Sequence, residues 1–181
     1  MKFVPKKMFF TKGHGNHRDE LRSFELALRN AGIEKCNLVH ISSILPSGCK
    51  IISKKEGLKQ LVPGMITFCV MARGSSDEKN RLLAASIGCA VPTYKGTYGY
   101  LSEHKAYGES EKIAGDYAED LAAGMLASTL GIEFDEDKNW DEKKEVFKIS
   151  DKIVRTTNIT QSTVVKKKGF TTVVAAAIFL F

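Results

Sequence analysis

The C-terminal stretch GFTTVVAAAIFLF, Gly169 to Phe181, sets how the rest of the chain must fold. It is too apolar to face water on either side, so we expect a central strand that is covered on both faces. Its most apolar part, Val173 to Phe181, is about half as long as a helix that spans a bilayer. The stretch therefore predicts a layered protein built around a buried sheet, and no membrane partner.

Two helices are predicted from apolar residues at helical spacing. In Arg18–Ala31, Phe24 and Leu28 belong to the apolar face, and Gly32 follows as a stop signal. Ser110–Leu130 has the strongest helical pattern in the chain. Ile113, Tyr117 and Leu121 form one apolar stripe, and Ala114, Ala118, Met125 and Leu126 lie beside it.

Strand patterns fill most of the remaining chain. In Arg81–Val91, leucines and alanines favour a helix, but Ile87, Cys89 and Val91 alternate as in a strand, so periodicity leaves this segment open. Phe134–Lys144 is acidic and polar and is expected to be a loop or insertion. The other predicted strands are Cys36–Ile44, Met65–Ala72, Thr97–His104 and Asn158–Val165, with Arg73–Lys79 as a polar connection.

The order of these elements is helix, several strands, long helix, then strands to the end. An antiparallel sheet with helices on its outer faces fits this order. The chain has 181 residues and a mass of 20.0 kDa, and it contains no repeat or linker. We therefore expect a single α+β domain over residues 1–181.

The charge pattern argues against a nucleic-acid partner. The formal net charge is +6, but the charges are mostly interspersed, and the densest cluster, Lys166–Lys168, is typical of a solvated turn. No signal-peptide core follows the first ten residues, so we expect a cytoplasmic protein. The four cysteines form no C-x-x-C pair, which favours free thiols in a reducing compartment over a zinc or redox motif.

Three groups of residues are weak candidates for chemistry. His14 and His17 have a spacing that could share a metal, but no third ligand is near, and a mobile loop is the favoured interpretation. Gly96-Thr-Tyr-Gly99 is by itself a turn signal. The carboxylates Glu103, Glu109 and Glu111 are close in sequence, but charged residues are usually solvated.

A fourth candidate is the serine pair in Ile41-Ser-Ser-Ile-Leu-Pro46. On composition alone, Ser42 and Ser43 are a polar strand end. The alternative is a self-cleaving bond, in which the Ser43 hydroxyl attacks the carbonyl of Ser42 and converts the amide into an ester. β-Elimination and hydrolysis would then leave a pyruvoyl group at the start of a new chain, with residues 1–42 as the small chain and 43–181 as the large one.

The sequence around this pair resembles the pyruvoyl-dependent arginine decarboxylase family. The resemblance spans nearly the whole chain, and the pattern of an asparagine, four residues, Ser-Ser, two residues and proline is fairly specific. The matching stretches are Phe24–Ile33, Asn37–Pro46, Leu61–Pro63, Ala84–Pro92, Gly99–Glu103 and the alanines Ala175–Ala177.

The resemblance implies a four-layer α/β/β/α sandwich with mainly antiparallel sheets. It also implies a homotrimer whose active sites lie at subunit interfaces, and it assigns Arg81–Val91 to a strand. The substrate implied is L-arginine, which is converted to agmatine and CO2.

The resemblance also assigns roles to individual residues. Ser43 would become the pyruvoyl group, Ser42 would end the small chain, and Glu103 would donate a proton. Asn37 would position the processing or substrate group. Glu25 and Leu28 would receive the substrate side chain, although the family position often carries Asp where this chain has Glu25, which puts substrate length in question.

These residue types suit the chemistry. A ketone that forms an imine with the substrate amine acts as an electron sink, so neither a pyridoxal phosphate lysine nor a metal is required. Glu103 needs a proton to quench the carbanion, and a pKa raised by burial would favour this role. A carboxylate such as Glu25 matches a guanidinium.

Spacing raises a question about Asn37. It lies six residues before Ser43, roughly 20 Å along a straight strand. Either the strand bends sharply, or Asn37 serves the site of a neighbouring subunit.

The sequence thus predicts a self-processing, pyruvoyl-dependent decarboxylase of L-arginine. Two alternatives stay open. One is a decarboxylase of another amino acid, such as histidine, and the other is a non-catalytic trimeric relative that never cleaves.

Overall fold

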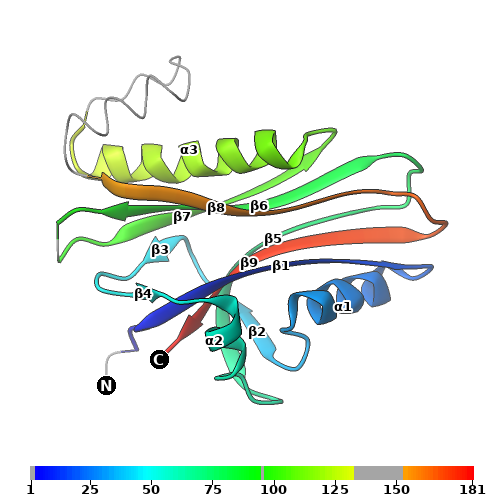
Figure 1. Ribbon diagram of the computed structural model, residues 1–181, viewed down its shortest axis with the longest axis horizontal. Coiled ribbons are helices and arrows are strands. Elements are labelled where there is room, and N and C mark those ends of the chain that lie inside the picture. Colours follow the sequence, from blue (N-terminus) through cyan, green and yellow to red (C-terminus); the bar gives the residue numbers. More distant parts are fainter. Residues whose placement is uncertain (1–2, 95, 133–152) are drawn as a thin grey trace.

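The computed structural model has four layers, in which two stacked sheets lie between two helices (Figure 1). It describes residues 3–94, 96–132 and 153–181. Helix α3 (Glu111–Thr129) covers the four-stranded sheet, and helix α1 (Glu20–Ala31) covers the five-stranded sheet. The predicted four-layer α+β sandwich is confirmed, whereas the predicted loop Phe134–Lys144 lies outside the described residues.

The larger sheet is antiparallel at its centre and parallel at both edges. In spatial order it contains β2 (Asn37–His40), β5 (Ile66–Ser76), β9 (Phe170–Leu180), β1 (Lys7–His17) and β4 (Lys50–Ile51). A short helix, α2 (Lys54–Leu58), follows β4.

The smaller sheet is antiparallel throughout. One of its two central strands is the segment that periodicity left open. The order is β3 (Ile44–Leu45), β7 (Gly99–Tyr107), β6 (Leu82–Pro92) and β8 (Ile153–Val164). The assignment of Arg81–Val91 to a strand is therefore confirmed.

Strand β9 is the covered central strand that its sequence predicts. Its residues alternate between two cores, because successive side chains of a strand point to opposite faces. Val173, Ala175, Ala177 and Phe179 pack between the two sheets. Val174, Ala176, Ile178 and Leu180 pack toward α1.

Strand β1 corrects the interpretation of His14 and His17 as part of a mobile loop. Both lie in a strand that pairs with β9 along its whole length. Its glycines allow α1 to approach closely, since a Cβ on Gly13 would lie 2.4 Å from the Ala27 carbonyl oxygen, and one on Gly15 would lie 2.4 Å from that of Ser23. The glycine content that suggests a loop is thus a packing requirement.

Helix α3 packs on its sheet with the alanines predicted beside the stripe and not with the bulky stripe itself. Ile113, Tyr117 and Leu121 are 58%, 50% and 38% exposed. The neighbouring stripe of alanines is fully buried, and a Cβ on Gly88 would lie 2.0 Å from the Ala118 carbonyl oxygen. Close contact between helix and sheet therefore selects the alanine face.

Helix α1 ends at the predicted stop signal, whereas it begins at Glu20 instead of Arg18. The Asp19 side chain accepts a hydrogen bond from the Arg22 N–H at 3.0 Å, and Gly32 ends the helix with φ 83°. Within the described ranges, neither α1 nor any other helix has the length and apolarity needed to cross a membrane.

Candidate active site

The serine pair lies where the chain passes from one sheet to the other. Strand β2 belongs to the larger sheet and β3 to the smaller one, so residues 41–43 connect the two layers. The prediction of a single strand over Cys36–Ile44 is wrong in its second half, because the chain leaves β2 after His40 and bends before β3.

Backbone hydrogen bonds fix both ends of this crossing. The Ile41 N–H donates to the Cys69 carbonyl at 3.0 Å, which is the last bond to the larger sheet. The Leu101 N–H donates to the Ser43 carbonyl at 2.8 Å, which is the first bond to the smaller sheet. Ser42 lies between these two anchors.

A tight turn is centred on Ser43. The Ile44 N–H donates to the Ser42 carbonyl oxygen at 2.9 Å, which is the two-residue hydrogen bond of a γ-turn. The Ser42 side chain is exposed and that of Ser43 is half-buried.

The β3–β7 register places Glu103 two residues along β7 from the residue that lies beside Ser43. Ile44 pairs with Tyr100, and continuing this register sets Ser43 beside Leu101. Glu103 is two residues further along β7 and shares a face with Leu101, which is buried between the sheets. Glu103 is thus about 7 Å along the strand from the level of Ser43.

The surroundings of Glu103 favour a protonated carboxyl. Partial desolvation raises the pKa of Glu103 above its ordinary value even though the residue is exposed, and the positive charge of His40 opposes part of this rise. Burial, and then the charge of Glu103, raise the pKa of the Cys69 thiol to about 12. His40 and Cys69 are partners in the β2–β5 register, so the three side chains share one electrostatic environment.

His40→Gln is expected to move the descending limb of the decarboxylation pH profile to higher pH. A proton-donating carboxyl acts in its protonated form, so turnover falls as pH rises through its pKa. Removing the positive charge that lowers the Glu103 pKa raises that pKa. The measurement is kcat against pH, with His14→Gln as the matched control, because His14 is an exposed histidine of β1. A limb that stays in place or moves to lower pH would contradict an influence of His40 on Glu103.

The other two candidate carboxylates are engaged elsewhere. Glu109 lies 3.0 Å from Nε2 of His104, and Glu111 accepts a hydrogen bond from the Lys12 ammonium at 2.6 Å. The structure therefore does not bring Glu103, Glu109 and Glu111 together as one acidic cluster.

The histidine pair and the glycine turn have structural roles. Nδ1 of His17 accepts a hydrogen bond from the Asp19 N–H at 3.0 Å. Across the part of the chain that the structure describes, no group of three or more His, Cys, Asp or Glu side chains could hold a metal. Gly99 opens β7, where a Cβ would lie 2.3 Å from the Ala90 carbonyl oxygen.

Asn37 lies at the opposite end of β2 from the serine pair. Its side-chain amide donates to the Gly64 carbonyl at 2.9 Å, and its backbone N–H donates to the Met65 carbonyl at 2.8 Å. The chain does bend after β2, as one of the two alternatives required. The hydrogen bonds of Asn37 nevertheless go to Gly64 and Met65, and not to Ser43.

Glu25 and Leu28 lie on α1, which covers the outer face of the larger sheet. Glu25 forms an ion pair with the guanidinium of Arg29, one turn later on the same helix. Leu28 is partly buried and packs into the core beneath the helix. Within one chain, the contacts given for Glu25 and Leu28 are therefore with Arg29 of the same helix and with the core beneath it, and not with the serine pair.

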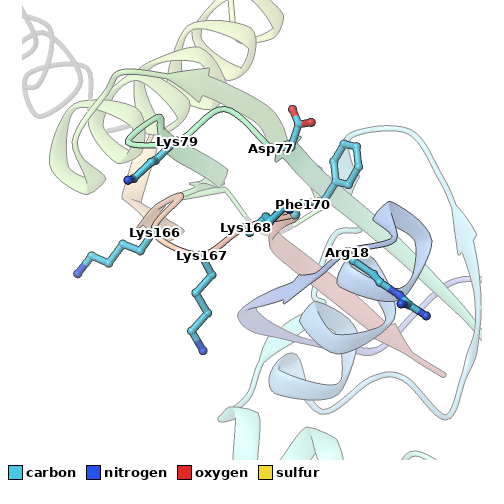
Figure 2. Close-up of a pocket in the computed structure, with 8 residues that line it drawn as sticks. Arg18, Asp77, Lys79, Lys166, Lys167, Lys168 and Phe170 are labelled. Atoms are coloured by element: carbon cyan, nitrogen blue, oxygen red, sulfur yellow. The ribbon is translucent and has the colours of Figure 1, made fainter.

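A pocket of about 800 Å³ lies away from the serines. It is lined by Arg18, Asp77, Lys79 and the turn Lys166–Lys168, among others. Figure 2 shows the side chains of Lys166 and Lys167 extending away from this pocket, so their ammonium groups do not converge on a common point. This arrangement agrees with the predicted solvated turn.

Known proteins of one family are similar to this chain over nearly its whole length. A family model described as "Pyruvoyl-dependent arginine decarboxylase" matches residues 7–181. A protein of Chloroherpeton thalassium named "Probable pyruvoyl-dependent arginine decarboxylase" is 64% identical over 99% of this chain and 100% of its own length. "Pyruvoyl-dependent arginine decarboxylase 2" of Methanosarcina acetivorans is 54% identical over 98% of this chain and 97% of its own length.

Proposed function

The chain belongs to the pyruvoyl-dependent arginine decarboxylase family, and on that premise we propose that it cleaves its own Ser42–Ser43 bond and converts L-arginine to agmatine and CO2. The relatives of that name match it at 54–64% identity over nearly their whole length. The observation that carries the proposal is the position of Glu103, with its raised pKa, on the strand that holds the Ser43 carbonyl.

The residues at the crossing fit a pyruvoyl group that is made from the chain itself. Such a group supplies a ketone that combines with the substrate amine and accepts the electron pair released with CO2. Ser43 provides its atoms, so the reaction needs neither pyridoxal phosphate nor a metal. Glu103 holds the proton that replaces CO2 on the substrate carbon, and the partial desolvation that raises its pKa favours the protonated form.

We also propose that the site is completed by a neighbouring subunit of a homotrimer. Strands β2 and β3 are both edge strands, so the serine pair lies at an open rim of the sandwich where a second copy could pack. Asn37 then acts in the site of the adjacent subunit, since its own Ser43 lies at the other end of β2. The mass of the native assembly in solution tests this arrangement.

The cytoplasm is the compartment we propose. Four free cysteines are present, and Cys69 and Cys89 are buried in the core. Free thiols persist in a reducing compartment.

Glu25→Gln is expected to raise KM for arginine while cleavage of the chain continues. Glu25 already binds a guanidinium, that of Arg29, which supports its proposed role toward the substrate. If a neighbouring subunit buries the pair that Glu25 forms with the substrate, losing one partner costs about 2–5 kcal/mol, or roughly 30-fold or more in KM. An exposed helix pair contributes only about 0.3–0.5 kcal/mol, which is about twofold.

Two further variants sharpen this test. Glu25→Asp shortens the carboxylate and is expected to weaken arginine binding if the site has adjusted to Glu25. Arg29→Gln releases Glu25 from its ion pair and is expected to lower KM. Identical arginine kinetics in the wild type and all three variants would remove Glu25 from the substrate site.

One preparation tests the proposed function as a whole. The purified protein is incubated separately with L-arginine and L-histidine, and the amine products and the chain masses are measured. Cleaved protein that forms agmatine supports the proposal. Histamine as the main product would favour a histidine decarboxylase, and intact protein without product would favour a non-catalytic relative.

A further inference from the structure

A backbone hydrogen bond near Ser43 fixes the position of the Ser42 carbonyl, which is the group that self-cleavage must attack. Attack by the Ser43 hydroxyl has to occur at the carbonyl carbon of Ser42. The oxygen of this carbonyl accepts a hydrogen bond from the Ile44 N–H at 2.9 Å, and the next carbonyl, that of Ser43, accepts one from Leu101 at 2.8 Å. Both carbonyls that flank the reacting hydroxyl are therefore held by backbone donors.

The Ile44 N–H is available for this role because the strand ladder does not use it. The Leu101 bond to the Ser43 carbonyl makes Ser43 and Leu101 a hydrogen-bonded pair of the antiparallel ladder. The adjacent pair, Ile44 with Tyr100, is then of the non-hydrogen-bonded kind, whose N–H groups point away from the partner strand. Because β3 is the edge strand of its sheet, no further strand lies on the side to which this N–H points. The N–H donates instead to the Ser42 carbonyl of its own chain segment.

We propose that the backbone N–H of Ile44 is the oxyanion donor of self-cleavage, an inference that rests on the proposed function. In the first step, Ser43 Oγ forms a bond to the Ser42 carbonyl carbon and gives its proton to a base or to water. The electron pair of the carbonyl moves to the oxygen, which becomes an oxyanion. The C–N bond then breaks as the nitrogen takes up a proton, which leaves an ester between the two serines.

The negative charge develops on the atom that already accepts the Ile44 hydrogen bond. A hydrogen bond to an ionised acceptor is roughly twice as strong as one between neutral groups, so the donor stabilises the transition state more than the ground state. A donor fixed in place before the reaction also needs no reorganisation. Asn37 is committed elsewhere within the chain, because its side-chain amide donates to Gly64. Later elimination and hydrolysis consume water and release ammonia, and they do not involve this contact.

Replacing Ile44 by its α-hydroxy acid analogue tests the proposal, because the ester linkage removes the N–H and keeps the side chain. Removing one oxyanion donor typically slows a reaction about 10²–10³-fold, and we expect a loss of that size in the rate of chain cleavage. Intact mass spectrometry after synthesis measures this rate. Hydrolysis of the new ester would give chains divided after residue 43, which differ in mass from chains divided after residue 42.

The same replacement at Ile41 is the matched control. It also removes one backbone N–H and one hydrogen bond, here to Cys69, on the other side of Ser42. We expect the Ile41 analogue to cleave within a fewfold of the wild-type rate. Cleavage of the Ile44 analogue at the wild-type rate would overturn the oxyanion assignment alone, whereas a wild-type chain that never cleaves would overturn the proposed function.

A second measurement does not depend on the folding of the ester variant. In Ser43→Ala, the Ile44 amide hydrogen is expected to exchange slowly with solvent, because the Ser42 carbonyl still accepts its bond. Exchange at the rate of an unstructured peptide would contradict the proposal.

Discussion

Ser43→Ala is expected to leave a single intact chain of 181 residues without arginine decarboxylase activity. Without a hydroxyl at position 43, nothing attacks the Ser42 carbonyl, and no pyruvoyl group forms. The loss of turnover should be complete within the limits of the assay, because the electron sink itself is missing. Gel analysis and product measurement on the same sample check both expectations.

Ser42→Ala is the matched control for this variant. Ser42 is exposed and its hydroxyl is not the attacking group, so this protein is expected to cleave at the wild-type rate or more slowly. If Ser43→Ala still divided into two chains, or if Ser42→Ala alone blocked division, the assignment of the attacking serine would be wrong.

Glu103→Gln is expected to cleave to some extent but to lose decarboxylation. The amide is nearly the same size as the carboxyl, and it has no transferable acidic proton. Removing a general acid typically lowers turnover about 10²–10⁴-fold. The measurement is kcat at saturating arginine, normalised to the amount of cleaved chain so that slow processing does not count as slow chemistry.

Glu109→Gln is a suitable control, because Glu109 faces His104 instead of the serine pair. Its turnover is expected to match that of the wild type. Unchanged turnover in Glu103→Gln would exclude Glu103 as the proton donor and would leave its raised pKa without a catalytic role.

Much of the layered fold follows from apolar patterning. Gly169–Phe181 predicts a covered central strand, and β9 is buried on both faces. The faces of the helices are harder to predict, because hydrophobic periodicity ranks bulky residues above small ones. In α3 the bulky stripe with Tyr117 is exposed, and alanines make the contact that Gly88 permits.

Glycine residues within a strand also lead to a wrong prediction of secondary structure. Gly13 and Gly15 make residues 13–17 look like a loop, yet they form part of β1 directly beneath α1. This role depends on how close a distant helix lies, which local sequence does not record. Likewise, β5 continues to Ser76, into the segment predicted as a polar connection.

The candidate site could be predicted only in part for a similar reason. The Ser42–Ser43 pair and Glu103 are identified by resemblance, but their proximity depends on the register between β3 and β7. His40 was missed, because its effect on Glu103 acts between two sheets. The Ile44 N–H belongs to the backbone, so no residue type marks it.

The mass of the purified, untreated protein tests the central claim most directly. Self-cleavage between Ser42 and Ser43 predicts two chains of 42 and 139 residues, the larger one starting with a pyruvoyl group that reacts with carbonyl reagents. A single intact chain of 181 residues in a folded preparation, with no cleavage on prolonged incubation, would contradict the account.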